Sequence, residues 1–201
     1  MSDGRRGTAG RPLLDVIEAL ARGGVELVVL REREWSGAEW TEAARRLEPA
    51  RARGLRVVAS RRLDMARALD LDGVHLGHEA VSVREARGFL GREALVGYSA
   101  HDGDEARRAS AEGASYVMLS PIYDTDSKPL AAARGCEWLR QTSVALPVPV
   151  LALGGLTVTR VAEVLAAGAF GVAAVAALGA APDPEAAARE FRRALADEAS
   201  R

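Results

Sequence analysis

The chain has 201 residues, of which 48% are apolar and 27% are charged, so it can bury a core of ordinary size. Its net charge of −1 excludes a general attraction to nucleic acid or to an anionic membrane, and we expect neither as a partner. The one cysteine, Cys136, excludes an intramolecular disulfide. No apolar run reaches the roughly 20 residues of a membrane helix, and the first residues do not form a signal peptide. We therefore expect a single cytoplasmic domain over residues 1–201.

Short apolar segments recur along the chain, and most of them are continuously apolar and not alternating. This pattern is typical of strands that are buried on both faces of a parallel sheet. The expected strands are residues 25–32, 55–60, 73–77, 95–100, 116–121, 148–155 and 171–179.

Segments of helical composition lie between these strands, and a further one, residues 12–23, precedes the first strand. Ser36 is followed three residues later by Glu39, which is the capping-box pattern of a helix start. Asp183 precedes Pro184, a pair that is typical of a cap and a first helical position. The chain therefore alternates strand and helix, which predicts repeated βαβ units around a parallel sheet.

The expected architecture is a single (β/α)8 TIM barrel whose first strand is truncated. Seven strands can be counted, and an eighth would have to precede the helix at 12–23. Residues 1–11 offer only "MSDGRR" there, which we interpret as a remnant of that strand and its loop. A doubly wound open sheet is the competing architecture, but the Gly-x-Gly-x-x-Gly turn that would favour it after the first strand is absent.

Polar and cationic residues gather after the expected strands, where a barrel of this kind builds its site. They are Arg31, Glu32, Arg33, Ser60, Arg61, Arg62, His75, His78, Glu79, Ser99, His101, Thr125, Asp126, Ser127 and Lys128. Such a rim on a nearly neutral protein predicts an anionic ligand.

The segment "LALGGLTVTR" makes a phosphate the more specific expectation. Gly154 and Gly155 follow a strand and precede a helix, and glycines there let backbone N–H groups approach phosphate oxygens. The next expected strand carries mostly small residues in "AAVAALG", which favours the same interpretation. An ordinary turn is the alternative explanation for the glycine pair.

The three histidines differ in their expected roles. His75 lies within an expected strand, where a buried structural histidine is the simpler explanation. His78 and His101 lie at or just after strand ends and can titrate near neutral pH. None of them has the spacing of a zinc site with another histidine, cysteine or acid, so no metal site is predicted.

With these motifs the sequence resembles the thiamine phosphate synthase superfamily, and most closely its thiazole tautomerase (TenI-like) branch. The resemblance covers about residues 12–195. It rests on "VVLRERE", "GVHLG", "VGYSAHDGDEA", "YVMLSPIYDTDSK", "VPVLALGGLT" and "AFGVAAVAAL", in this order. It implies a (β/α)8 barrel that binds a thiazole phosphate at its mouth.

The resemblance also implies roles for individual residues. Residues that would bind the thiazole and its phosphate are Arg31, Arg33, Ser99, Thr125, Ser127, Lys128, Gly154, Gly155, Val175 and Ala176. Lys128 would also stabilise charge during the reaction. For the proton transfer, His101 and His78 are the nearby candidates that this chain itself offers, with Glu79 as a third.

Some positions depart from the pattern of the family. The synthase carries a glutamine where this chain has Val29, and an Asn-Asp pair where it has Ser60 and Arg61. That aspartate is a Mg²⁺ ligand, and an arginine cannot replace it because it repels the metal and donates no oxygen. The histidine of the tautomerase falls where this chain has Pro121.

Three functions follow from these observations. The first is a thiazole tautomerase, which needs no cofactor. The second is the synthase itself, which joins a pyrimidine pyrophosphate to a thiazole phosphate and alone requires Mg²⁺. The third is a binding protein or regulator that holds thiazole phosphate without turnover. A homodimer is plausible for a barrel of this size, and one hypothesis places the true start of the chain upstream of Met1.

Overall fold

The computed structural model describes residues 1–2, 7–126 and 131–199 of the chain, and its strands form a parallel sheet. The strands are β1 Leu27–Leu30, β2 Arg56–Ser60, β3 Gly73–Leu76, β4 Leu95–Ala100, β5 Tyr116–Leu119, β6 Val150–Leu153 and β7 Gly171–Ala173. They follow one another in chain order from β1 to β7. A doubly wound sheet reverses its strand order at a switch point, so the chain order excludes that alternative and agrees with a TIM-barrel-like α/β fold.

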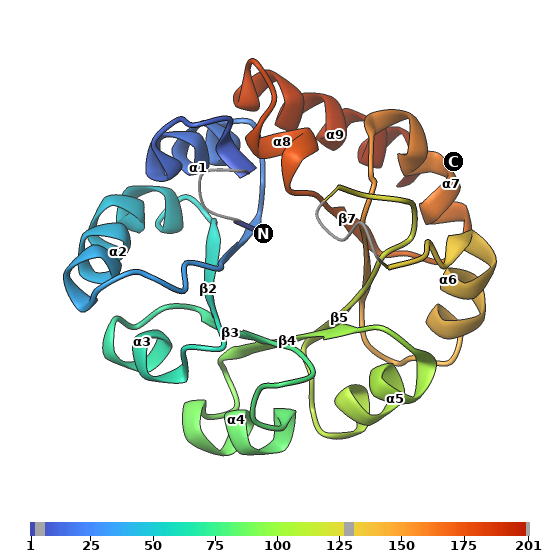
Figure 1. Cartoon of the computed structure of the whole chain (residues 1–201), viewed down its shortest axis with the longest axis horizontal. Coiled ribbons are helices and arrows are strands. Elements are labelled where there is room, and N and C mark those ends of the chain that lie inside the picture. Colours follow the sequence, from blue (N-terminus) through green and yellow to red (C-terminus); the bar gives the residue numbers. More distant parts are fainter. Residues whose placement is uncertain (3–6, 127–130, 200–201) are drawn as a thin grey trace. The chain divides into compact units, whose positions relative to one another are not determined.

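Helices occupy most of the connections between the strands (Figure 1). They are α1 Leu13–Arg22, α2 Gly37–Arg51, α3 Leu63–Ala68, α4 Val83–Leu90, α5 Gly103–Ala111, α6 Gly135–Ser143, the 3-10 turn η2 Val158–Arg160, α7 Val161–Ala166, α8 Ala176–Gly179 and α9 Pro184–Ala199. Within the described residues, no helix is both long enough and apolar enough to cross a membrane.

Two of the expected helix starts are confirmed. The Ser36 hydroxyl accepts a hydrogen bond from the backbone N–H of Glu39, whose carboxylate accepts one from the Ser36 backbone, which completes a capping box. Asp183 accepts a hydrogen bond from the backbone N–H of Ala186 at the start of α9. Each contact satisfies N–H groups that a helix start leaves without intrahelical partners.

The described residues form two compact units. One comprises Met1–His75 and Val175–Arg192, and the other comprises Leu76–Ala174 and Arg193–Arg201. The expectation of a single domain over 1–201 stays a prediction, and each unit is described below by itself.

In the first unit, the core forms around β1, β2 and the helices α1 and α2. β1 pairs in parallel with β2, and the valines of both strands are almost completely buried. The α2 residues Trp40 and Leu47 are buried as well. Continuous burial explains why the central residues of these strands are apolar and not alternating, whereas Arg56 at the start of β2 is exposed.

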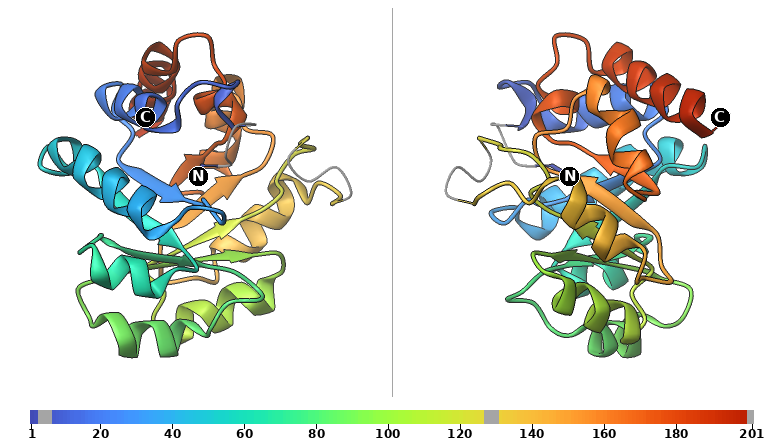
Figure 2. Two further views of the ribbon diagram at one scale, coloured as in Figure 1. Left: turned by 60° about the vertical axis from the view of Figure 1, so that its left-hand side comes forward. Right: turned by 90° about the vertical axis from the view of Figure 1, so that its right-hand side faces the viewer.

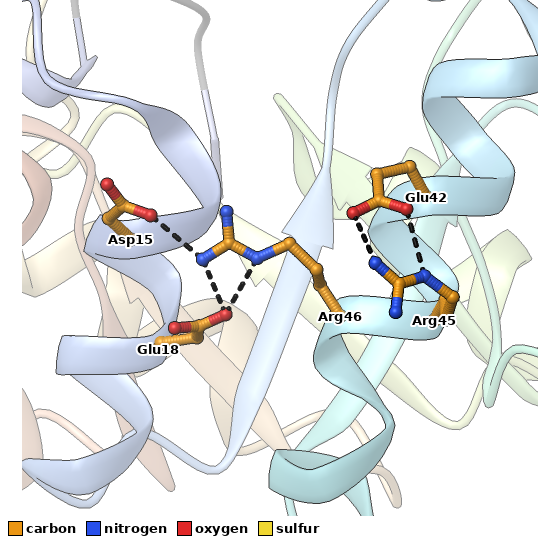
Figure 3. Close-up of polar contacts among 5 residues, drawn as sticks. All are labelled: Asp15, Glu18, Glu42, Arg45 and Arg46. Atoms are coloured by element: carbon orange, nitrogen blue, oxygen red, sulfur yellow. Dashed lines mark hydrogen bonds and ion pairs between the residues drawn. The ribbon is translucent and has the colours of Figure 1, made fainter.

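Helices α1 and α2 are also joined by charge (Figure 3). Arg46 of α2 donates hydrogen bonds to Asp15 and Glu18 of α1, at 2.8 and 2.7 Å. The hydrogen bond to Asp15 and then that to Glu18 raise the pKa of the Arg46 guanidinium. These side chains are partly exposed, so the pairs orient the two helices more than they stabilise the fold.

Ser2 lies beside β1, on the edge where the strand before it would pair. Its backbone N–H donates to the carbonyl of Val29 at 2.8 Å, and its hydroxyl accepts from the backbone N–H of Arg31. Ser2 is itself buried. No strand precedes β1 in the described part of the chain.

In the second unit, β4, β5, β6 and β7 pair in parallel, each with the next. Helices α4 and α5 lie on one side of β4 and β5, as both views of Figure 2 show. All four residues of β5 are buried, and Leu139 of α6 and Val164 of α7 are buried too. The sheet of this unit is therefore covered by helices, which leaves the ends of its strands for polar residues.

One expected strand was wrong in its second half. Residues 171–179 were expected to be a single strand, but β7 ends at Ala173 and Ala176–Gly179 form the short helix α8. Alanine favours a helix more than a strand. Gly179 is packed so tightly against Gly7 that a Cβ on it would lie 2.2 Å from the Gly7 carbonyl oxygen.

Candidate functional site

The ends of β1 and β2 in the first unit bring a cation beside a hydroxyl group. Leu30 pairs with Ala59, so Arg31 and Ser60 are the next positions in register on their strands. Ser60 in turn pairs with His75 of β3. These three residues therefore form one row across the carboxyl ends of parallel strands, where such folds place their ligands.

His75 is a buried structural histidine, as the simpler interpretation predicted. Its side chain is buried, with the residue 2% exposed, and burial lowers its pKa to about 3. The imidazole is therefore neutral at physiological pH. Its carbonyl accepts a hydrogen bond from the backbone N–H of Arg61 at 3.0 Å, which fixes the turn after β2.

Arg61 adopts a left-handed backbone conformation, with φ of +61°. Residues other than glycine adopt this conformation at a cost, and aspartate and asparagine tolerate it better than arginine does. The side chain of Arg61 is exposed and that of Arg31 is half-buried. Arg33, also predicted to bind the ligand, is exposed in the loop after β1.

The residues at the end of β2 do not fit a Mg²⁺ ion. Ser60 and Arg61 supply one hydroxyl and a cation, whereas Mg²⁺ prefers carboxylate oxygens. Val29, at the position of the synthase glutamine, is 1% exposed in the core of β1 and carries no polar atom. Among the described residues, no three histidines, cysteines or acids are arranged to hold a metal.

In the second unit, the segment after β5 runs beside the end of β6. The backbone N–H of Ile122 donates to Leu153, and that of Tyr123 donates to Gly154, at 2.9 and 3.1 Å. On its other side, the carbonyls of Pro121 and Ile122 accept from the backbone at the start of α6. This segment, which leads to Thr125, is therefore held along its backbone from two sides.

The glycine pair is required by this close approach. Gly154 and Gly155 have φ of +101° and +63°, in the left-handed region. A Cβ on Gly154 would lie 2.8 Å from Pro121, and one on Gly155 would lie 2.5 Å from the carbonyl oxygen of Asp124. A packing role for both glycines is thus established by the geometry, and phosphate binding by their backbone stays a prediction.

Side chains strengthen the same contact. The Tyr123 hydroxyl donates to Glu163 of α7 at 2.6 Å and lies 3.2 Å from the Sγ of Cys136 on α6. The hydrogen bond from Tyr123 lowers the pKa of Glu163, while burial raises the pKa of the Cys136 thiol. The Arg160 guanidinium stacks on the Tyr123 ring, 4.1 Å from its centroid. Cys136 is thus part of the contact between the segment after β5 and α6.

The structure brings His78 and His101 to one carboxylate. The Oε1 of Glu105 lies 3.1 Å from the Nδ1 of His78, and its Oε2 lies 3.5 Å from the Nδ1 of His101. The same Oε2 accepts from the backbone N–H of His101 at 2.9 Å. His101 follows β4 directly, and Glu105 lies in the first turn of α5, with Asp102 as its cap.

Sequence reasoning did not identify Glu105. The signal was present, because Glu105 stands three residues after the cap Asp102 and four after His101. The same spacing was used to predict the helix start at Ser36 and Glu39. What the spacing alone could not give is the approach of His78, which is 27 residues away in the sequence.

The remaining predicted residues have separate outcomes. Ser99 is half-buried near the end of β4, and Thr125 is half-buried after β5. Ser127 and Lys128 lie outside the described residues, so their roles stay predictions. Val175 caps α8 in the first unit and Ala176 is its first residue.

Pro121 offers no group for proton transfer, and the candidate role of Glu79 stays a prediction. Pro121 is buried and has no acidic or basic atom, as the sequence already indicated. Glu79 is exposed in the loop that follows β3. The histidine pair with Glu105 is therefore the acid–base group that the geometry brings together in the second unit.

Comparison with known proteins identifies the family. The model of the thiamine monophosphate synthase family matches residues 3–178. A thiamine-phosphate synthase of Natronomonas pharaonis is 40% identical over 196 residues, which cover 96% of this chain and 92% of that protein. One from a Roseiflexus species is 36% identical over 194 residues, or 96% of this chain and 82% of that protein.

The fold agrees with this result. The solved structure of a thiamine phosphate pyrophosphorylase from Pyrococcus furiosus superimposes with a TM-score of 0.87 at 28% identity, covering 98% of this chain and 94% of that one. The match supports the TIM-barrel-like fold. The similar proteins carry the name of the synthase and not that of the tautomerase branch, so only the wider family is established. The chain belongs to the thiamine monophosphate synthase family of thiamine biosynthesis.

Proposed function

We propose that this protein is a thiamine-phosphate synthase, which joins a thiazole phosphate to a pyrimidine pyrophosphate and releases pyrophosphate. The observation that carries the proposal is 40% identity, over 96% of the chain, to a protein of that name. The resemblance of the sequence favours the tautomerase branch, whereas the names of the relatives support the synthase.

In this reaction the thiazole nitrogen forms a bond to the pyrimidine methylene carbon. The bond from that carbon to the pyrophosphate oxygen breaks, and its electron pair leaves on the pyrophosphate. Negative charge therefore develops on the leaving group, which guanidinium groups stabilise well. Arg31 and Arg61, which follow β1 and β2, are the residues of the first unit that we assign to this anion.

A second candidate function is the thiazole tautomerase, in which a base removes one proton of the thiazole and an acid returns another. The specific observation in its favour is the pair of histidines on Glu105, since such a reaction needs one acid and one base. The absence of a carboxylate at Ser60 and Arg61 favours it as well, because this reaction needs no Mg²⁺.

NMR time courses distinguish these functions. One sample holds the protein with thiazole phosphate, pyrimidine pyrophosphate and Mg²⁺, and a second holds the same mixture with EDTA. A third holds only the carboxylated thiazole phosphate tautomer. Pyrophosphate release in either of the first two supports the synthase, and loss of ring-proton signals in the third above the spontaneous rate supports the tautomerase. Binding of thiazole phosphate with all three at background would overturn both and leave a binding protein.

A further inference from the structure

The carboxylate of Glu105 contacts two imidazoles through the same kind of nitrogen. Oε1 faces the Nδ1 of His78, and Oε2 faces the Nδ1 of His101. A carboxylate accepts hydrogen bonds and donates none. A proton on Nδ1 therefore makes each contact attractive, as a hydrogen bond for His78 at 3.1 Å and as a weaker charge contact for His101 at 3.5 Å. The neutral form of each ring is then the tautomer in which Nε2 is the basic atom.

Glu105 is well placed to fix this arrangement. Its side chain is 13% exposed, whereas those of His78 and His101 are 74% and 42% exposed. The hydrogen bond from the His101 backbone and the position on the first turn of α5 restrain the carboxylate further. A nearly buried anion thus supports two solvent-accessible rings, which is the usual arrangement of a residue that orients others.

Other charged groups surround this cluster. Asp102 caps the helix below Glu105, and Arg134 donates to the carbonyl of His101 at 2.6 Å. Tyr98 is close enough that the charge of Glu105 adds to burial in raising the pKa of its hydroxyl. The two imidazoles therefore share one carboxylate, each at a different oxygen.

We propose that Glu105 is a positioning residue that holds His78 and His101 as an acid–base pair for proton transfer on the thiazole. The inference rests on the tautomerase candidate above for its catalytic part. The pair lies in the same unit as Ser99 and Thr125, the residues predicted to bind the thiazole. The neutral ring takes the thiazole proton on its Nε2, and the protonated ring gives one back from its own Nε2, so no net proton is consumed.

The first test needs no substrate. The chain has only three histidines, so the imidazole nitrogens of ¹⁵N-labelled protein can be assigned with single His→Asn variants. At a pH of about 8, where ordinary imidazoles are neutral, we expect His78 and His101 to carry their protons on Nδ1. In Glu105→Gln at least one ring should return to the Nε2–H form that free histidine prefers. Nε2–H tautomers in the wild type, or an unchanged spectrum in Glu105→Gln, would overturn the proposal.

Glu85→Gln is the matched control. Glu85 occupies the same capping position in α4, where its carboxylate accepts from Ser82 and contacts no histidine in the described structure. Both variants lose a capping carboxylate, so only Glu105→Gln should change the imidazole signals. If Glu105→Gln does not fold, the wild-type spectrum still decides which nitrogen carries each proton.

The second test measures exchange of the thiazole ring protons. Glu105→Gln should lower kcat by about 10²-fold, the loss typical of a misplaced catalytic group, and should flatten the dependence of kcat on pH. Its KM should change less than about twofold, and so should the rate of the control Glu85→Gln. An equal loss in both variants would overturn the positioning role. If the wild type has no exchange activity, the tautomerase candidate fails, and the imidazole spectrum still decides whether Glu105 sets the two tautomers.

Discussion

Replacing Gly155 with alanine tests how closely the segment after β5 packs on the end of β6. Gly155 has φ of +63°, a conformation that costs alanine about 1–2 kcal/mol. The new Cβ would also lie 2.5 Å from the carbonyl oxygen of Asp124 and 2.7 Å from the Cβ of Tyr123. Overpacking of this kind costs about 1–3 kcal/mol, because backbone atoms must move. Together the two terms predict a loss of about 2–5 kcal/mol in the free energy of unfolding.

Gly10→Ala is the control that separates these terms. Gly10 has φ of +81°, but no atom lies within 4 Å of the Cβ that it would acquire. It should lose only the conformational part, about 1–2 kcal/mol. Urea unfolding followed by circular dichroism gives both values, provided that the m-value is unchanged. Because the clash also displaces the segment leading to Thr125, only Gly155→Ala should weaken binding of thiazole phosphate. Losses that agree within about 0.5 kcal/mol would refute the close approach.

Three further predictions follow from single residues. Arg61→Asp should fold with a stability within about 1 kcal/mol of the wild type, since aspartate tolerates a left-handed backbone. In calorimetry, Mg²⁺ should strengthen the binding of pyrophosphate to this variant but not to the wild type. Asp72→Asn should lower the free energy of unfolding by about 2–4 kcal/mol at pH 7. Burial alone would raise the pKa of Asp72, but hydrogen bonds from Val57, Arg56 and Arg51 lower it. The stabilisation by the ionised carboxylate is lost as the pH falls below the ordinary pKa of 3.8, so the stabilities of the two proteins should converge in urea titrations at acid pH. Arg11→Lys should cost about 1–3 kcal/mol in thermal unfolding, because one ammonium cannot replace a guanidinium that contacts the carbonyls of Thr8, Gly179, Ala181 and Pro182.

Much of the fold could be predicted because its signals are local. Buried strands in a parallel sheet are continuously apolar, and all seven expected strands occur, although most are shorter than expected. The capping box at Ser36 is equally local, because its two hydrogen bonds join residues three positions apart. The prediction failed at residues 174–179, where an alanine-rich segment satisfies both patterns and tertiary packing around Gly179 decides.

The site was harder to predict because its contacts are distant in the sequence. The glycine pair was singled out for phosphate binding, with an ordinary turn as the alternative, and phosphate binding stays a prediction. The structure adds the packing against Pro121 and Asp124, which comes from a segment about 30 residues earlier. Glu105 was missed for the same reason, since nothing in the local sequence brings His78 to it. Residue types and strand ends therefore predict at which strand ends a site is expected, but not which distant residues contact one another there.

The departures from the synthase pattern are not spread evenly over the chain. Val29, Ser60 and Arg61 all lie at β1 and β2 of the first unit, where they replace a glutamine and the Asn-Asp pair. Among the described residues that the resemblance assigns to the thiazole and its phosphate, Ser99, Thr125, Gly154 and Gly155 lie in the second unit, and Arg31, Arg33, Val175 and Ala176 lie in the first. A chain that had lost all function would accumulate changes at both sets of residues. Retention of the thiazole set alone, with Pro121 as its one departure, is instead what we expect if thiazole phosphate is still bound while the requirement for the metal-bound pyrimidine pyrophosphate has changed. Thiazole phosphate binding is therefore the property common to every candidate function, and the response to Mg²⁺ separates them.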